Sequence, residues 1–270
     1  MNLRKCLVKS FHLYIKEFHC FNILKFVFLI LFLNGESIYS AIRKDKVESP
    51  GLLESFKKDY KVHKGIYNLK KRTFALGGKA VPVLIKVMKG DKFPDRNRWA
   101  ATFLLGRIMG KKSSSFIKNF LDHPNWVLRL ASLKTLLLLK ENNLGDGIRR
   151  ALKDNSLLIR SQALENIKKL KLKKYSKDVW AMLFDKKNYH QGKNKKRKRS
   201  LLIKKVVKII GELKFSSALK PFLSLVQSDK YKDIFYEIDY SLQKISGKKS
   251  PSKNKKEKRY FWKSFEKGLN

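Results

Sequence analysis

Cysteine is almost absent from this sequence of 270 residues, which contains only Cys6 and Cys20. Both precede an apolar run that ends at residue 33. If the first forty residues are removed on export, the remaining chain has no thiol. A disulfide framework, a thiolate nucleophile and a cysteine-ligated metal are then excluded. This shortage is compatible with an oxidising compartment.

Acidic residues are the second shortage, with 22 Asp and Glu against 63 Lys and Arg and a formal net charge of +41. Cleavage after residue 40 would remove five cations and two acids and leave a charge of +38. Such an excess favours polyanionic partners. Most of the cations are Lys, so a compositional bias of the source genome is the alternative explanation. That bias accounts for the lysines more easily than for the shortage of acids.

Histidine is scarce, and its five copies show no metal-ligand spacing. They are His12, His19, His63, His123 and His190. The sequence also has no glycine-rich phosphate loop and no nucleophile elbow. We therefore expect no catalytic residue, no metal, no cofactor and no small-molecule substrate, and a protein that is not an enzyme.

One acidic cluster is present, made of Asp229, Asp233, Glu237 and Asp239. Asp233 and Glu237 are four residues apart and share a helix face, where they could bind a cation. The interpretation that we favour is that the cluster balances the charge of nearby lysines.

Residues 1–40 have the order of a secretory signal peptide. Five cations precede the end of the apolar run Phe26–Leu33, and the small residues Ser40 and Ala41 follow it. A basic segment, a short apolar segment and a small-residue site in this order direct export. Even counted from Phe21 the run is too short to span a bilayer comfortably. We expect a cleaved signal and a periplasmic or secreted protein, with an inner-membrane protein anchored by an uncleaved signal as the alternative.

A helical pattern is repeated three times at a fixed period in the middle of the chain. The copies begin at Arg98, Arg129 and Arg160, so they are 31 residues apart. In each copy the third residue after the arginine is small and the seventh is a branched aliphatic, which defines one helix face. A fixed period of this length is typical of stacked helical repeats.

Two further copies extend this register. If Gly211 is equivalent to Gly106, the arginine position is held by Ile203, 43 residues after Arg160, and then by Phe235, 32 residues later. The longer step leaves an insertion of about 12 residues within the fourth repeat. The spacing therefore predicts five helix pairs with one interruption.

The first helix of each pair also carries a recognisable motif. Leu76-Gly77-Gly78 is followed by Ala80-Val81-Pro82, then by a turn with Asp91 and by the Arg98 helix, which ends at Leu105-Gly106. Pro82 falls in a first helical turn, where its missing N–H costs little. This pattern resembles bacterial HEAT-repeat proteins of the bilin-lyase-like type. The resemblance implies an all-α fold, an α-solenoid of about five HEAT-type helix pairs with N-terminal capping helices and a C-terminal tail helix.

The predicted layout has four parts. They are a signal peptide at 1–40, a linker and N-terminal capping helix at 41–73, the HEAT-repeat array at 74–247 with a basic loop insertion at 185–199, and a lysine-rich linker with an aromatic tail helix at 248–270. We expect Trp262 and its aromatic neighbours to cover the last repeat. Trp99 and Trp180 lie on apolar helical faces and are predicted to be core residues, whereas Trp126 is predicted to be a surface aromatic.

Two sets of cations are candidate sites. The first is the arginine ladder Arg98, Arg129 and Arg160, which could line a groove for acidic ligands. The resemblance implies instead that each arginine pairs with a turn carboxylate of a neighbouring repeat, and we favour this structural role. Three aspartates precede the arginines by six or seven residues, namely Asp91, Asp122 and Asp154.

The second set is the basic insertion, with six cations in seven residues. They are Lys193, Lys195, Lys196, Arg197, Lys198 and Arg199. Such a run repels itself and is expected to be a loop. It could bind lipopolysaccharide, anionic lipid head groups or nucleic acid, and a solvated loop without a partner is the alternative.

Together these patterns favour a non-enzymatic, exported scaffold or adaptor. It would be a monomer that binds a protein or another macromolecule through a strongly basic helical surface. The alternative is a nucleic-acid or other polyanion binder, with the HEAT-like alkylpurine DNA glycosylases as the nearest enzymatic comparison. The bilin-lyase activity that the family name suggests has no chromophore pocket to support it in the sequence.

Overall fold

A computed structural model of the chain places residues 51–270 in one compact unit. It describes residues 51–61, 63–191, 197–199, 201–251 and 254–269, with the side chains of 190–191 and 197–199 excepted. The predicted signal peptide lies outside the described residues. None of the described helices is both long and apolar enough to cross a membrane.

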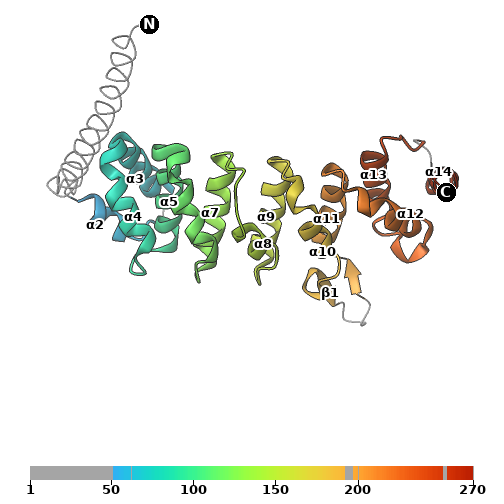
Figure 1. Cartoon of the computed structure of the whole chain (residues 1–270). Helices are drawn as coiled ribbons and strands as arrows, with labels where there is room; N and C mark the ends of the chain where they lie inside the picture. The colour runs from blue at the N-terminus through green and yellow to red at the C-terminus, as the bar shows by residue number, and fades with distance from the viewer. Residues whose placement is uncertain (1–50, 62, 192–196, 200, 252–253, 270) are drawn as a thin grey trace, which may run out of the picture. The chain divides into compact units, whose positions relative to one another are not determined.

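Residues 81–246 form five helix pairs that follow one another in chain order (Figure 1). The pairs are α4 (Val81–Lys89) with α5 (Asp95–Met109), α6 (Ser114–Lys118) with α7 (Trp126–Leu138), α8 (Gly147–Leu152) with α9 (Leu157–Lys169), α10 (Ser176–Ala181) with α11 (Leu201–Glu212), and α12 (Leu219–Gln227) with α13 (Phe235–Ser246). The second helices of successive pairs pack side by side. The predicted all-α, HEAT-like helical fold of five pairs is confirmed.

Shorter elements complete the array. Helices α2 (Leu52–Lys57) and α3 (His63–Ala75) precede the first pair, and α14 (Lys255–Lys267) follows the last. Single 3-10 turns lie next to the helices of the pairs, at η1 (Gly77–Ala80), η2 (Gly110–Ser113), η3 (Asn119–Asp122), η4 (Lys173–Tyr175), η5 (Lys186–Asn188), η6 (Ser216–Ala218) and η7 (Asp229–Tyr231).

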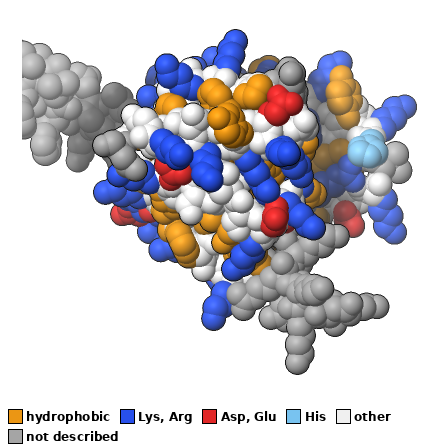
Figure 2. Space-filling view, turned by 90° about the vertical axis from the view of Figure 1, so that its right-hand side faces the viewer, with side chains coloured by type: hydrophobic (Ala, Val, Ile, Leu, Met, Phe, Trp, Pro, Cys, Tyr) orange, Lys and Arg blue, Asp and Glu red, His pale blue; other side chains and the backbone are white. Residues whose placement is uncertain are grey.

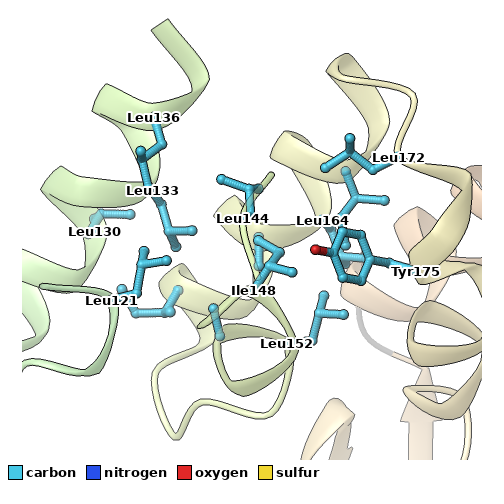
Figure 3. Close-up of a cluster of buried hydrophobic side chains, with 14 of the residues drawn as sticks. Leu121, Leu130, Leu133, Leu136, Leu144, Ile148, Leu152, Leu164, Leu172 and Tyr175 are labelled. Atoms are coloured by element: carbon cyan, nitrogen blue, oxygen red, sulfur yellow. The ribbon is translucent and has the colours of Figure 1, made fainter. Parts of the chain in front are cut away.

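The core is a continuous series of interfaces between pairs (Figure 3). Leu133 and Leu136 of α7 are fully buried, and so are Ile148 of α8 and Leu164 of α9. Each of these side chains contributes about 1.5–3 kcal/mol by leaving water. Because a pair buries its apolar face only against its neighbours, the stack has to form as a unit.

The second helices of pairs two, three and four end in the same way. The second residue after the last helical residue takes the left-handed conformation at Lys140 (φ 51°), Lys171 (φ 51°) and Lys214 (φ 54°), and the N–H of the next residue donates to the carbonyl five residues earlier. This is the Schellman motif, in which glycine is the usual left-handed residue. Pairs one and five end differently, with a positive-φ glycine directly after the helix, at Gly110 and Gly247. The turns between pairs therefore carry lysine where glycine would be less strained.

Two glycines allow second helices to approach closely. A Cβ on Gly106 would lie 2.3 Å from Cγ2 of Thr135, and a Cβ on Gly211 would lie 2.5 Å from Cα of Ser241. Thr135 and Ser241 occupy the same place in their repeats, six residues after Arg129 and Phe235. The equivalence of Gly106 and Gly211 thus has a steric basis.

The insertion differs from the predicted loop. After η5 the chain forms two short antiparallel strands, β1 (Tyr189–Gln191) and β2 (Arg197–Arg199), with Tyr189 opposite Arg199. Backbone pairing holds the two ends of the basic segment together, so charge repulsion along the segment does not prevent local structure.

The tail helix is anchored by Asp239, a buried member of the acidic cluster. Asp239 of α13 accepts hydrogen bonds from Nζ of Lys258 at 2.8 Å and from Nε1 of Trp262 at 2.8 Å. Trp262 is fully buried, and Phe261 and Phe265 pack edge-on against it. Trp262 therefore covers the last pair, and Asp239 supplies the polar partner that a buried tryptophan requires.

The close approach at Gly211 leads to the first prediction. Gly211→Ala should lower the free energy of unfolding by about 1–3 kcal/mol, because the new methyl group meets the backbone of Ser241. Gly78→Ala is the matched control, since no atom lies within 4 Å of the added Cβ. Urea unfolding followed by circular dichroism measures both. Equal stabilities for the two variants would contradict the packing described for α11 and α13.

Candidate polyanion-binding surface

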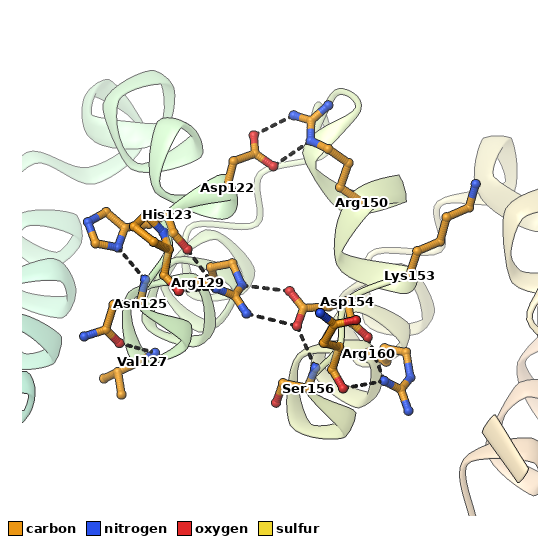
Figure 4. A network of polar contacts seen from close by, with 12 residues as sticks. Asp122, His123, Asn125, Val127, Arg129, Arg150, Lys153, Asp154, Ser156 and Arg160 are labelled. Atoms are coloured by element: carbon orange, nitrogen blue, oxygen red, sulfur yellow. Dashed lines mark hydrogen bonds and ion pairs between the residues drawn. The ribbon is translucent and has the colours of Figure 1, made fainter. Parts of the chain in front are cut away.

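Arg129 joins the second and third pairs (Figure 4). Its Nε and Nη2 donate to the two carboxylate oxygens of Asp154, at 2.7 and 3.0 Å. Its Nη1 donates to the carbonyls of His123 and Pro124, both at 2.8 Å. Asp154 also accepts the N–H of Ser156, at the start of α9. The bidentate contact between Arg129 and Asp154 therefore fixes two turns, one within the second helix pair and one within the third.

The other two arginines of the ladder bind their own turns in related ways. Nη1 of Arg160 donates to the carbonyls of Asp154 and Asn155, six and five residues earlier, as Arg129 does. Arg98 donates to the carbonyl of Met88 at 3.2 Å and pairs with Asp91 of its own repeat, at 3.3 Å. The side chain of Arg98 is only 4% exposed. The ladder serves the fold. Its member Arg129 lines an open depression, but Asp154 and two backbone carbonyls already hold that guanidinium.

Asp122, which the sequence placed before Arg129, has a different partner. Arg150 of α8 donates to its two carboxylate oxygens at 2.5 and 2.6 Å (Figure 4). A polar depression of about 300 Å³ lies between this pair and the Arg129–Asp154 pair. Because each guanidinium in it already holds a carboxylate, the depression presents little uncompensated charge.

His123 lies against the arginine ladder. Its Nδ1 accepts the backbone N–H of Asn125 at 3.0 Å, and its Nε2 lies 3.4 Å from Nη2 of Arg98. Burial of the ring and the positive charge of Arg98 lower the pKa of His123. The neutral form is therefore the one that the fold stabilises.

Carboxylates also join the second helices to one another. Glu165 of α9 pairs with Lys205 of α11 at 3.1 Å, and burial, which opposes ionisation, is outweighed by Lys205 and Lys169, so the pKa of Glu165 is lowered. Lys168 pairs with Glu212 at 3.3 Å. Near the tail, Asp229 pairs with Arg259 at 2.8 Å. Acids on these faces are thus engaged by cations of neighbouring elements.

The acidic cluster is divided among such contacts. Glu237 lies 4.0 Å from Lys204, whereas Asp229 and Asp239 hold Arg259 and Lys258 of the tail helix. Within the described ranges, no group of three or more His, Cys, Asp and Glu side chains is placed to hold a metal ion. Asp229 and Asp239 therefore hold α14, and Glu237 faces α11.

The tryptophans differ in exposure as the sequence indicated. Trp126 is 47% exposed at the start of α7. Trp99 is partly buried below Nζ of Lys134, which lies 5.4 Å from the ring centroid. Trp180 packs against Phe222 and Phe215. Among the described tryptophans only Trp126 is exposed, so the described surface has no row of tryptophans on which successive bases could stack.

The basic insertion is described only in part. Lys193, Lys195 and Lys196 lie outside the described residues, and only the backbone of Arg197, Lys198 and Arg199 is described, as β2. The structure therefore describes only the backbone at the C-terminal end of this candidate site, and its binding role stays a prediction.

A further set of cations was missed by sequence reasoning. We define the inter-pair edge by four exposed lysines in the turns between pairs: Lys140, Lys171, Lys173 and Lys214. Among the described residues, none of these four takes part in an ion pair. Lys140 and Lys171 are 31 residues apart and Lys171 and Lys214 are 43 apart, which are the repeat spacings themselves. That periodicity was the available signal.

The turns within pairs contain most of the carboxylates of the connections, although they contain lysines as well. These carboxylates include Asp91, Asp95, Asp122, Asp154, Asp229 and Asp233. Between pairs, Asp146, which pairs with Arg149, and Glu141 are the exceptions. Burial opposes the ionisation of Glu141, but hydrogen bonds from Asn143 and Ser114 and the charges of Lys118 and Lys111 lower its pKa. The two edges of the array therefore differ in their content of carboxylates.

The surplus of cations is visible on the C-terminal end of the array (Figure 2). Lys and Arg side chains are spread over this face, and Asp and Glu side chains between them are few. A surface of this kind attracts anions over roughly one Debye length, about 8–10 Å at physiological salt.

Comparison with known proteins concerns the architecture alone. No protein-family model matches the chain, and no curated protein matches its sequence. A solved structure described as the complex of CpcE and CpcF of phycocyanin lyase from Nostoc sp. PCC7120 matches with a TM-score of 0.42 and 11% identity. The match covers 81% of this chain and 93% of that chain.

This comparison corrects one expectation. The missing catalytic motifs led us to expect a protein that is not an enzyme, whereas the matched complex is a lyase. Missing sequence motifs do not exclude catalysis, because function depends on the residues of a site and not on the fold that carries them.

The environment of His123 predicts a pH-dependent stability. Its pKa is lowered from 6.5 in the folded chain, so the unfolded chain binds the extra proton more readily. The free energy of unfolding should therefore fall as the pH is lowered from about 7.5 to 5. His123→Asn, which keeps an acceptor for the N–H of Asn125, should flatten this dependence. Urea unfolding at a series of pH values measures it, and identical slopes for both proteins would contradict the assignment.

Proposed function

We propose that the array is a helical-repeat scaffold that binds a polyanion along the inter-pair edge. The observation that carries the proposal is the distribution of carboxylates. Acids in the turns within pairs hold arginines, as Asp154 holds Arg129. Acids on the second helices join one pair to the next, as Glu165 does with Lys205. The lysines of the inter-pair edge are exposed and have no such partner among the described residues.

The backbone at three of these lysines supports a role for their side chains. Lys140, Lys171 and Lys214 adopt a left-handed conformation that costs a non-glycine residue about 1–2 kcal/mol. Retention of lysine in the three central turns is explained if its positive charge is useful there.

Spacing also supports an extended partner. Packed helices lie about 8–10 Å apart, so equivalent lysines of adjacent pairs recur at about this interval. A polymer with a charge at every few ångströms can contact several of them at once, and the release of its counterions then drives binding. Lipopolysaccharide, anionic lipid and nucleic acid all offer such charges.

Substitution by glycine separates binding from folding. A triple variant with Lys140→Gly, Lys171→Gly and Lys214→Gly removes three charges and relieves the left-handed strain. The protein should become more stable, by about 1 kcal/mol at each site, and should bind less tightly. With a 30-nucleotide single-stranded oligonucleotide as the probe, the log–log salt slope should flatten by about 0.7 for each phosphate that the variant no longer neutralises.

The matched control removes three exposed lysines from the turns within pairs: Lys92→Gln, Lys153→Gln and Lys232→Gln. This control should retain the salt slope of the wild type. Anionic vesicles and lipopolysaccharide, titrated in parallel, identify the polyanion whose affinity falls most. If both triple variants bind every probe with the same reduced affinity, binding follows total charge and the edge has no special role.

The proposal places this activity outside the cytoplasm. Its support is the order of basic, apolar and small residues in the first forty positions. N-terminal sequencing of the protein from an expressing bacterial cell should give a chain that begins at Ala41 or within a few residues of it. Recovery of the full-length chain from the cytosol would contradict export, and recovery of the full-length chain from the inner membrane would indicate an uncleaved anchor.

A further inference from the structure

An apolar cavity of about 320 Å³ lies where the fourth pair is interrupted. Its wall includes five aromatic side chains from four different elements and the connections between them. They are Trp180, Phe184, Tyr189, Phe222 and Tyr231. Aliphatic side chains of α11 and α12 complete the wall, and Ser224 is its only hydroxyl group outside the tyrosines.

The insertion helps to build this cavity. Tyr189 opens strand β1, and Phe184 lies just before the insertion begins. Trp180 of α10 holds the aromatic wall together, with ring centroids 5.9 Å from Phe184 and 5.5 Å from Phe222. A regular repeat of 31 residues would have no counterpart of the strand that carries Tyr189. The cavity is therefore a feature added to the array and is not required by the stacking of helix pairs.

Phe184 marks the mouth of the cavity. Its side chain is 71% exposed, although one edge of it packs against Trp180. An apolar body that entered the cavity would cover this ring as well as the inner wall, and burial of apolar surface contributes about 25 cal/mol per Å². The volume equals that of about ten water molecules at about 30 Å³ each. It lies at the lower end of the range for small-molecule sites.

Cations neighbour three residues of the wall. The cavity wall itself contains no Lys, Arg, Asp or Glu. Outside it, Lys220 is exposed next to Pro221, and Nζ of Lys230 lies 5.9 Å from the centroid of Tyr231. The backbone register places Arg199 opposite Tyr189.

Neighbouring acids are already engaged. Asp229 pairs with Arg259 at 2.8 Å, and Asp185 accepts the backbone N–H of Lys187 at 2.9 Å. An apolar interior with cations beyond its mouth matches a ligand that has a hydrophobic body and one anionic group.

We propose that this cavity binds a small amphipathic anion, with an aromatic or medium-length acyl body inside and a carboxylate, sulfonate or phosphate at the cationic mouth. The site is separate from the inter-pair edge and does not depend on the polyanion proposal. It also departs from the sequence-based expectation of no small-molecule ligand.

Anilinonaphthalene sulfonate is a suitable probe, because it has two aromatic groups and one anionic group and its fluorescence rises in an apolar site. The whole chain should bind one molecule in the cavity. Ser224→Phe should weaken binding at least tenfold, because Ser224 is an exposed wall residue and its replacement fills the cavity without disturbing the core. Ser217→Phe, at an exposed position outside the wall, should bind as the wild type does.

A second experiment tests the anionic group. Decanoate should displace the probe at least tenfold better than decyltrimethylammonium at low salt. Phe184→Glu should reduce that preference relative to Phe184→Gln, because it places a carboxylate at the mouth. Circular dichroism confirms that each variant is folded, and Phe184 is exposed enough for its variants to serve if Ser224→Phe does not fold. Equal probe binding by all folded variants would overturn the site, and equal displacement by the two amphiphiles would overturn its preference for anions.

Discussion

Because acidic side chains number 22 against 63 Lys and Arg, each carboxylate that the fold uses to join two helices leaves cations elsewhere without a partner. The described carboxylates lie mainly in the turns within pairs and on the facing sides of the second helices. Asp154 alone holds Arg129, caps α9 and offers its carbonyl to Arg160. Cations are thus paired with carboxylates where helices join, and they lack such partners at the inter-pair edge. Because of that difference, unpaired positive charge is concentrated at one edge of the array.

The same joints explain how the array tolerates its charge. A guanidinium that is bidentate to a carboxylate and bonded to two carbonyls, as in Arg129, uses four of the five N–H groups that it can donate. Lysines at the edge remain in water, where repulsion between them is screened by salt. The arginines therefore fix the spacing of the helix pairs, and the lysines carry the surplus positive charge. The two kinds of cation have different roles in this protein.

Much of the fold could be predicted because the residues that recur in the repeat are ones that the packing of the helices requires. The spacing of Arg98, Arg129 and Arg160 indicated the helix pairs, and Gly211 aligned with Gly106 because both positions face a neighbouring helix at close range. The left-handed lysines could not be recognised, since a lysine after a helix also fits the helix dipole and ordinary solvent exposure. The anchor at Asp239 and the cavity beside Trp180 depend on contacts between residues 19 or more positions apart, such as Asp239 with Lys258 and Trp180 with Phe222, which no local pattern records. The strands of the insertion were not predicted, because only the charge repulsion within the basic run was considered. The backbone pairing between β1 and β2 was left out of that prediction.

The central claim is that a polyanion contacts the inter-pair edge rather than the whole cationic surface. Lysine-selective acetylation, read residue by residue by mass spectrometry with and without bound single-stranded oligonucleotide, tests it most directly. The account predicts that Lys140, Lys171, Lys173 and Lys214 are protected, while Lys92, Lys153 and Lys232 in the turns within pairs react at the same rate in both states. Uniform protection of both groups, or protection confined to the turns within pairs, would contradict it.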